Sequence, residues 1–141
     1  MKRRLLTDGR GIPLGVAVEG ANRHDCKLVQ ATLASQVLER PDCDGVPQNL
    51  CLDKGFDFDF VRKLVSCWGY TAHIRTRGEE KQEKAQVPGY RARRWGVERT
   101  HSWMNRFRRL LVRWEKKEED YLGLLHFALA WITFQAARLF G

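Results

Sequence analysis

The stretch "QNLCLDKGFDFDFVRKLVSCWGYTAHIRTR", residues 48–77, indicates the class of fold that the chain adopts. It begins with a short apolar run that ends at Asp53. A segment of helical character follows up to Gly69, and a second strand-like run, residues 70–77, closes it. A strand, a helix and a strand in succession are typical of α/β proteins. We therefore expect a mixed sheet flanked by helices.

The flanking sequence supplies the other elements of a single domain over residues 1–141. Two short apolar runs separated by "GRG" predict a β-hairpin over residues 2–18. A helix is expected to start with Asp25 as its cap and to be closed by Pro41. Residues 78–89 are charged and lack periodicity, which predicts a mobile loop, and apolar residues at helical spacing predict a packed helix over residues 118–139.

The positive charge of the chain is concentrated in one segment. The net charge is +8, and residues 91–117 hold ten basic and two acidic residues, so this segment accounts for the whole excess. Most of the basic residues are arginines, whose planar guanidinium groups match phosphate oxygens two at a time. Nucleic acid is therefore the expected partner, and a solvated basic helix is the alternative. The arginines concerned are Arg91, Arg94, Arg99, Arg106, Arg108 and Arg109.

Two carboxylates stand out against this charge. At helical spacing, Glu98 lies in the middle of a polar face with Arg91, Arg94, Ser102, Asn105 and Arg109. Asp53 ends a strand, at the edge of an α/β sheet where ligands usually bind. Oxygen ligands suit Mg²⁺ or Mn²⁺, and a pair of such ions serves phosphoryl transfer. The alternatives are an ion pair between Arg94 and Glu98, and a turn or capping role for Asp53.

Cysteine usage and hydropathy indicate a cytosolic protein. The four cysteines are widely spaced and form no C-x-x-C pair, as expected of free thiols in a reducing compartment. No apolar run of signal-peptide length follows the basic start of the chain. Polar residues, among them His126, Thr133 and Gln135, interrupt the C-terminal apolar run, so we expect no membrane-spanning segment.

Three stretches together resemble the C-terminal part of a DDE transposase of the insertion-sequence-five group, within the insertion-sequence-four-like families. They are "LLTDGRGIPLGVAVEGANRHD", "CLDKGFD" and "RRWGVERTHSWMNRFRRLLVRWEK", in the family's order and over nearly the entire chain. The last stretch is the most specific. In this resemblance Asp53 matches the family's second aspartate and Glu98 its glutamate. Arg94 matches the arginine of the tyrosine-arginine-glutamate-lysine signature.

The resemblance implies a ribonuclease H-like fold in which three acidic residues bind two Mg²⁺ ions. It implies DNA cleavage and strand transfer at insertion-sequence ends, with transposon-end and target DNA as partners. A homo-oligomer assembled on DNA in the bacterial cytosol, associated with the nucleoid, is implied as well. Asp53 and Glu98 would be the catalytic and metal-binding residues.

Several positions depart from the family pattern. The signature's tyrosine falls at Arg91 and its lysine at Asn105. The family's first aspartate lies on a strand upstream of the one that "RRLLTD" resembles, so the catalytic domain is expected to lack its first strand. Asp8 and Asp25 are not expected to replace that aspartate. A sheet without its first strand has an unpaired edge.

Three functional hypotheses remain open at this point. The chain is the catalytic part of a transposase, joined or complemented by an upstream segment that carries the first aspartate. Alternatively, it is a catalytically inactive remnant that binds DNA through its basic helix. The third hypothesis is an unrelated protein whose apolar C-terminal helix docks a partner.

Overall fold

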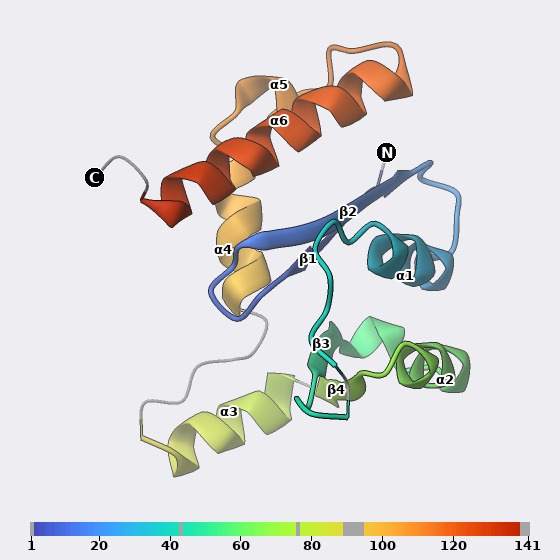
Figure 1. Ribbon diagram of the computed structural model, residues 1–141, viewed down its shortest axis with the longest axis vertical. Coiled ribbons are helices and arrows are strands. Elements are labelled where there is room, and N and C mark those ends of the chain that lie inside the picture. Colours follow the sequence, from blue (N-terminus) through green and yellow to red (C-terminus); the bar gives the residue numbers. More distant parts are fainter. Residues whose placement is uncertain (1, 43, 76, 89–94, 139–141) are drawn as a thin grey trace.

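The computed structural model describes residues 2–42, 44–75, 77–88 and 95–138, and in it strands and helices follow one another along the chain (Figure 1). The four strands of these residues are β1 (Lys2–Thr7), β2 (Pro13–Glu19), β3 (Asn49–Asp53) and β4 (Thr71–Arg75). The helices are α1 (Asp25–Ala34), the 3-10 turn η1 (Lys54–Phe56), α2 (Asp59–Cys67), α3 (Arg77–Gln86), α4 (Trp95–Met104), α5 (Arg108–Leu111) and α6 (Glu118–Ala137).

The first two strands form the hairpin that the sequence predicts. β1 and β2 pair antiparallel. Asp8 closes the turn between them, because its Oδ1 accepts hydrogen bonds from the backbone N–H of Arg10 (2.8 Å) and of Ile12 (2.9 Å). Gly11 has a φ of 86°, a conformation that glycine adopts without the strain that a Cβ would introduce. Asp8 therefore has a structural role in this turn.

The predicted strand–helix–strand unit at residues 48–77 is confirmed. β3 and β4 pair in parallel, with Leu50 opposite Ala72. α2 connects them, and its Val61 and Val65, one helical turn apart, are fully buried. Gly69, with a φ of 79°, follows the end of α2 and turns the chain into β4.

The strands form two separate pairs. Within the described residues, the sheet orders are β1-β2 and β3-β4, one pair antiparallel and the other parallel. The α/β class with flanking helices is thus confirmed. The expectation of one continuous mixed sheet needs correction, because no ladder of hydrogen bonds joins β1 to β3 in this part of the chain.

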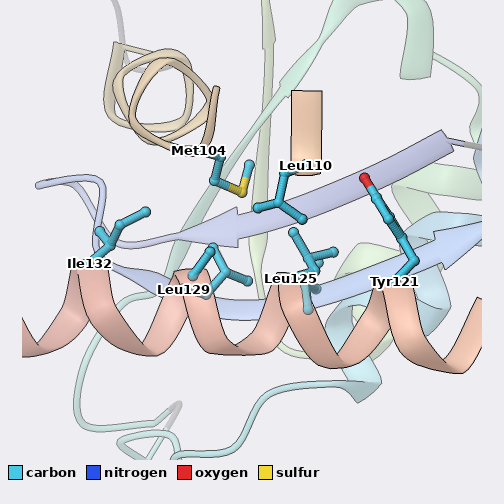
Figure 2. Packing of buried hydrophobic residues seen from close by; sticks show 8 residues of the cluster. Met104, Leu110, Tyr121, Leu125, Leu129 and Ile132 are labelled. Carbon is cyan, nitrogen blue, oxygen red and sulfur yellow. The ribbon is translucent and has the colours of Figure 1, made fainter. Parts of the chain in front are cut away.

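Two apolar layers hold the hairpin between them. Leu5 of β1 packs against one layer and Leu6 belongs to the other, because neighbouring side chains of a strand point to opposite faces. α4, α5 and α6 supply most of the first layer, whose labelled members in Figure 2 are Met104, Leu110, Tyr121, Leu125, Leu129 and Ile132. The second layer joins α1, α2 and β3 through Val29, Leu33, Leu50, Phe56, Val61 and Val65.

Arg3 of β1 ties the hairpin to the C-terminal helices. One of its guanidinium nitrogens, Nη2, donates to Oδ1 of Asn105 at 2.9 Å. The other, Nη1, lies 3.4 Å both from the backbone carbonyl of Leu110 and from the hydroxyl of Tyr121. This single side chain therefore contacts three segments that lie far from it in the sequence.

α6 occupies most of the segment for which a packed helix is expected. Its residues Leu125, Leu129 and Ile132 are buried, as the helical spacing predicts, whereas Ala136 is exposed. Leu139 lies outside the described residues. None of the helices in the described ranges combines the length and the apolar character that crossing a membrane requires.

Two local expectations are wrong. Residues 78–86, expected to form a loop, belong to α3, because glutamate, lysine, glutamine and alanine favour a helix even without an apolar stripe. Glu83 of α3 also forms an ion pair with Arg75 at the end of β4. α1 has His24, not Asp25, at its N-cap position and ends at Ala34, well before Pro41.

We expect Leu125→Ala to lower the free energy of unfolding by about 2–5 kcal/mol, because it leaves a cavity in the first layer. Phe127→Ala on the same helix is the matched control. Leu125 is 0% exposed and Phe127 67%, so the control should change stability by at most about 0.5 kcal/mol. Urea unfolding followed by circular dichroism measures both. Equal losses in the two variants would contradict this packing of α6.

Candidate active site and nucleic-acid surface

A hollow of about 370 Å³ lies between β1, β3 and α4. Asp53, the last residue of β3, and Glu98, in the first turn of α4, both line it. They are 45 positions apart in the sequence. The fold thus brings the two acidic residues singled out by the sequence to the same cavity.

The backbone around Asp53 explains why its side chain reaches the hollow. The residue is extended, with a φ of −67° and a ψ of 153°, and η1 begins directly after it. Although Asp53 occupies the N-cap position of η1, its side chain makes no capping hydrogen bond. The predicted capping role of Asp53 is therefore not observed at η1. It is exposed at the carboxyl end of the strand.

The carboxylate of Asp57 stabilises the turn after Asp53 through two ion pairs. Its Oδ1 lies 2.7 Å from Nη2 of Arg62, and its Oδ2 pairs with Lys54. Hydrogen bonds from Lys54 and then from Arg62 lower the pKa of Asp57 below its usual value. Asp57 is thus engaged in local ion pairs, which leaves Asp53 as the carboxylate of this turn that lines the hollow.

His101 also lines the hollow, and sequence reasoning missed it. It follows Glu98 by three positions on α4, so both side chains lie on the same side of the helix. Burial lowers the pKa of His101, and the nearby positive charges of Arg3 and Arg4 lower it further. The imidazole is therefore neutral at pH 7. The spacing of Glu98 and His101 is the signal that could have found it.

Carboxylate oxygens are the ligands that Mg²⁺ and Mn²⁺ prefer, so the chemistry of Asp53 and Glu98 suits such an ion. Two carboxylates are fewer than a complete bimetal centre uses. Over the described ranges, no three or more His, Cys, Asp or Glu side chains gather in a way that could hold a metal ion. Among the described residues, Asp53 and Glu98 thus lie at one hollow without a complete metal-binding cluster.

A second and larger hollow, of about 1110 Å³, lies on another side of α4. Arg99 and Trp103 of α4 line it, and the guanidinium of Arg99 lies over the ring of Trp103, 4.4 Å from its centre. The lining contains no acidic residue. Its other basic and aromatic members are Arg10, Arg106, Phe107, Trp131 and Arg138. Arg10 and Arg138 come from distant parts of the chain, and sequence analysis did not single them out.

The predicted DNA-binding arginines divide into three groups. Arg99 and Arg106 line the second hollow. Arg108 and Arg109 are exposed in α5, where Arg109 lies 3.8 Å from the carboxylate of Glu115. Arg91 and Arg94 lie outside the described residues, and with them the predicted ion pair between Arg94 and Glu98.

The expected polar face running from Arg91 to Arg109 needs correction, because it assumed one continuous helix. α4 ends at Met104, and α5 begins only at Arg108. Asn105 lies in the break between them, and its Oδ1 accepts a hydrogen bond from Nη2 of Arg3 in β1. Glu98 and Arg99, which are adjacent within α4, line different hollows, because successive residues of a helix point in different directions.

Comparison with known proteins identifies the family of the chain. A family model described as a transposase DDE domain matches residues 1–132. A protein of Burkholderia cepacia, described as a candidate transposase for insertion sequence element IS402, is 29% identical over 146 residues. The match covers 97% of this chain but only 64% of that relative. No solved structure matches the chain. The family match extends over nearly all of the chain, which therefore belongs to the transposases with a DDE domain.

Proposed function

We propose that the chain is the C-terminal catalytic part of an insertion-sequence transposase, which cleaves DNA at the ends of the element and transfers the freed strand to a target. The observation that carries this proposal is the meeting of Asp53 and Glu98 at one hollow. Because they are 45 positions apart in the sequence, the fold and not the local sequence brings them to this hollow. Membership of the DDE transposase family supports the same activity.

The fold belongs to the proposal as well. A hairpin, a helix and a parallel strand pair, in this order, suit a ribonuclease H-like domain that lacks one strand. In such a domain the carboxylates lie at strand ends and on a late helix. Asp53 at the end of β3 and Glu98 on α4 occupy places of that kind.

Asp53 and Glu98 are the residues that would hold Mg²⁺ or Mn²⁺, two ions in the complete site. A bound ion of this kind polarises a phosphoryl oxygen and lowers the pKa of an attacking water. The two carboxylates contribute the negative oxygen ligands. A third carboxylate would come from an upstream transposase segment, because Asp8, which also lines the hollow, holds the hairpin turn, and the described residues contain no group of three that could hold a metal ion.

The arginines hold the substrate in this proposal. Arg99, Arg106, Arg108 and Arg109 would contact phosphates of transposon-end and target DNA. We assign Arg91 and Arg94 the same role from the sequence. Arg99 and Glu98 point from α4 into different hollows. The guanidinium of Arg99 can therefore bind a phosphate without pairing with the carboxylate of Glu98. A homo-oligomer on DNA, in the nucleoid of the bacterial cytosol, completes the proposal.

A second candidate function is a catalytically inactive remnant that binds DNA through its basic surface. The observation that favours it is that no three His, Cys, Asp or Glu side chains of the described residues could together hold a metal ion, although Asp8, Asp53 and Glu98 all line the hollow. In this case the chain binds DNA with a strong salt dependence and does not nick it in Mg²⁺. Nicking by the 141-residue chain itself, lost in Glu98→Gln, would exclude the second candidate.

We expect a longer transposase polypeptide, which adds the upstream segment and its aspartate to residues 1–141, to nick transposon-end DNA in Mg²⁺. Asp53→Asn or Glu98→Gln should each lower the rate on the order of a hundredfold or more, because each removes a charge that stabilises the transition state. Asp44→Asn, at an exposed carboxylate outside the hollow, is the matched control and should keep the rate. Gel analysis of labelled DNA measures the rates, and undiminished cleavage by either site variant would refute the assignment.

DNA binding by the 141-residue chain should weaken as salt rises. Arg106→Gln is expected to reduce the slope of log K against log salt by about 0.9, the contribution of one phosphate contact. Arg23→Gln, at a mostly exposed arginine paired with Glu19 near α1, is the control and should leave the slope unchanged. Fluorescence anisotropy with duplex DNA at several salt concentrations measures both. Identical slopes in wild type and Arg106→Gln would exclude a phosphate contact by Arg106.

The lowered pKa of His101 predicts a pH dependence of stability. The unfolded chain takes up this proton near pH 6.5, whereas the folded chain resists protonation until a lower pH. The free energy of unfolding should therefore decrease as the pH falls below about 6.5. His101→Gln should show a smaller decrease between pH 7.5 and pH 5. Urea unfolding at pH 7.5 and pH 5 measures the free energy of unfolding of the wild type and of His101→Gln. An equal decrease in the two proteins would contradict the attribution of the pH dependence to His101.

A further inference from the structure

α6 is apolar on more than the side that it buries. Figure 2 shows Leu125, Leu129 and Ile132 projecting from one side of the helix into the first layer. The opposite side carries two large rings, those of Phe127, which is 67% exposed, and Phe134, which is 41% exposed. A helix that is apolar all round is normally covered on all sides. Exposed apolar surface of this kind marks a site of association.

The exposed side of α6 has the residue spacing of a surface that pairs with a second helix. Its apolar and small members are separated by four, three, four and three residues, and all are exposed: Gly123, Phe127, Ala130, Phe134 and Ala137. This is the spacing of positions a and d in a coiled coil, which keeps the same side chains facing a neighbouring helix. We call these residues the α6 seam. Its members are alternately small and aromatic.

The glycine of the seam has no role in the packing of the chain on itself. Glycine inside a helix is destabilising relative to alanine. A Cβ added at Gly123 would meet no heavy atom within 4 Å outside its own helical backbone in the described residues, so the fold does not require glycine there. The missing side chain leaves room for a bulky group of a neighbouring helix.

The α6 seam is complementary to itself when two copies of α6 run in opposite directions. A two-fold axis between positions 128 and 129 places Phe127 opposite Ala130 of the second copy, and Phe134 opposite Gly123 of the second copy. Each ring then meets a small residue, as interdigitating side chains require. In a parallel pair, by contrast, each ring would face the same ring of the second copy.

The charges at the two ends of α6 agree with the antiparallel direction. Glu119 and Asp120 are exposed in the first turn of the helix, and Arg138 follows its last residue. The same two-fold axis places Glu119 opposite Arg138 of the second copy, and it does so at both ends of the pair. Opposite charges across an interface favour association and fix its register.

We propose that two copies of the chain associate through the α6 seam, as an antiparallel pair of α6 helices related by a two-fold axis. The pairing names the surface of the homo-oligomer that belongs to the proposed function, and to that extent it rests on that function. The size and charge complementarity of the seam does not depend on it.

The two-fold axis also relates the basic surfaces of the two copies. Trp131 lines the second hollow and stacks on Phe134 of the seam, with ring centres 5.8 Å apart. A two-fold axis perpendicular to the paired helices keeps equivalent flanks of both helices on one side. The second hollows of the two copies therefore lie on the same side of the pair, where both can contact DNA.

Sedimentation equilibrium of the 141-residue chain, without DNA or Mg²⁺, tests the pairing. We expect a reversible equilibrium between monomer and dimer. One pair of helices is a small interface, so the dissociation constant should lie in the micromolar range. Monomers at every concentration up to hundreds of micromolar would overturn the proposal, and so would open-ended aggregates in place of a dimer. DNA cleavage is measured separately, so a failure of pairing is distinguishable from a failure of the proposed activity.

A matched pair of substitutions locates the interface. Phe127→Asp should raise the dissociation constant of the dimer tenfold or more, because it places a charge opposite Ala130 of the second copy. Phe60→Asp is the control, at a ring of α2 that is 57% exposed, and should leave the constant unchanged. Circular dichroism shows whether each variant is folded. An unchanged constant in folded Phe127→Asp would contradict the proposal, and if that variant is unfolded the charge exchange below decides.

An exchange of charges tests the antiparallel direction. Glu119→Arg and Arg138→Glu should each raise the dissociation constant several-fold at low ionic strength, because each places like charges opposite one another at both ends of the pair. The chain that carries both substitutions should regain the wild-type constant. In a parallel pair each position faces itself, so all four chains would have the same constant. Equal constants in the four chains, or no recovery in the double variant, would refute the antiparallel pair.

The pairing also fixes the conditions for comparing the stability of Leu125→Ala and Phe127→Ala. Association adds to the apparent stability of the folded chain at concentrations above the dissociation constant. Their unfolding is therefore compared at concentrations well below it, where both chains are monomers.

Discussion

The structure depends on the burial of both faces of the N-terminal hairpin. Leu5 and Leu6 are adjacent in β1, and the pleat of the strand sends them into different apolar layers. One layer fixes α4 and α6 on the hairpin, and the other fixes α1, α2 and β3. The distance between β3 and α4, and hence the position of the carboxylates they carry, is therefore set by the hairpin that lies between the layers. A polar residue in place of either leucine would loosen one side of the site.

α4 also depends on the hairpin for its orientation. The hydroxyl of Thr100, which is fully buried, donates a hydrogen bond to the backbone carbonyl of Gly11 in the hairpin turn. This bond fixes the rotation of α4 about its axis close to Glu98. With the rotation fixed, neighbouring residues along the helix line different hollows, one bordered by carboxylates and the other by arginines and aromatic rings. The division of charge follows from helix geometry and one buried contact.

Local sequence patterns predicted the elements with clear signals. The hairpin, β3, α2 and β4 follow from apolar runs bounded by glycines, and Asp53 and Glu98 were singled out before their common hollow was visible. Residues 78–86 form a helix without an apolar stripe, so their sequence has no periodicity that would predict one. The break between α4 and α5 was missed because helical residues continue on both sides of it.

Local sequence patterns do not predict which residues far apart in the sequence come together in the fold. Arg10 and Arg138 meet at one hollow only after the chain has folded, and His101 differs from a core histidine only by what surrounds it. The interruption of the sheet could not be seen either, because pairing between strands depends on residues far apart in the sequence. The roles of Arg91 and Arg94 rest on sequence alone.

The contacts of Arg3 have a consequence for synthesis on the ribosome. Its partners lie 102, 107 and 118 positions further along the chain, so none of them exists when the first strand leaves the exit tunnel. Contacts of such high order slow folding, because a long loop has to close before any of them forms. β1 therefore lacks these three partners until Tyr121 has been synthesised. During that interval its apolar side chains are accessible to chaperones and to other nascent chains.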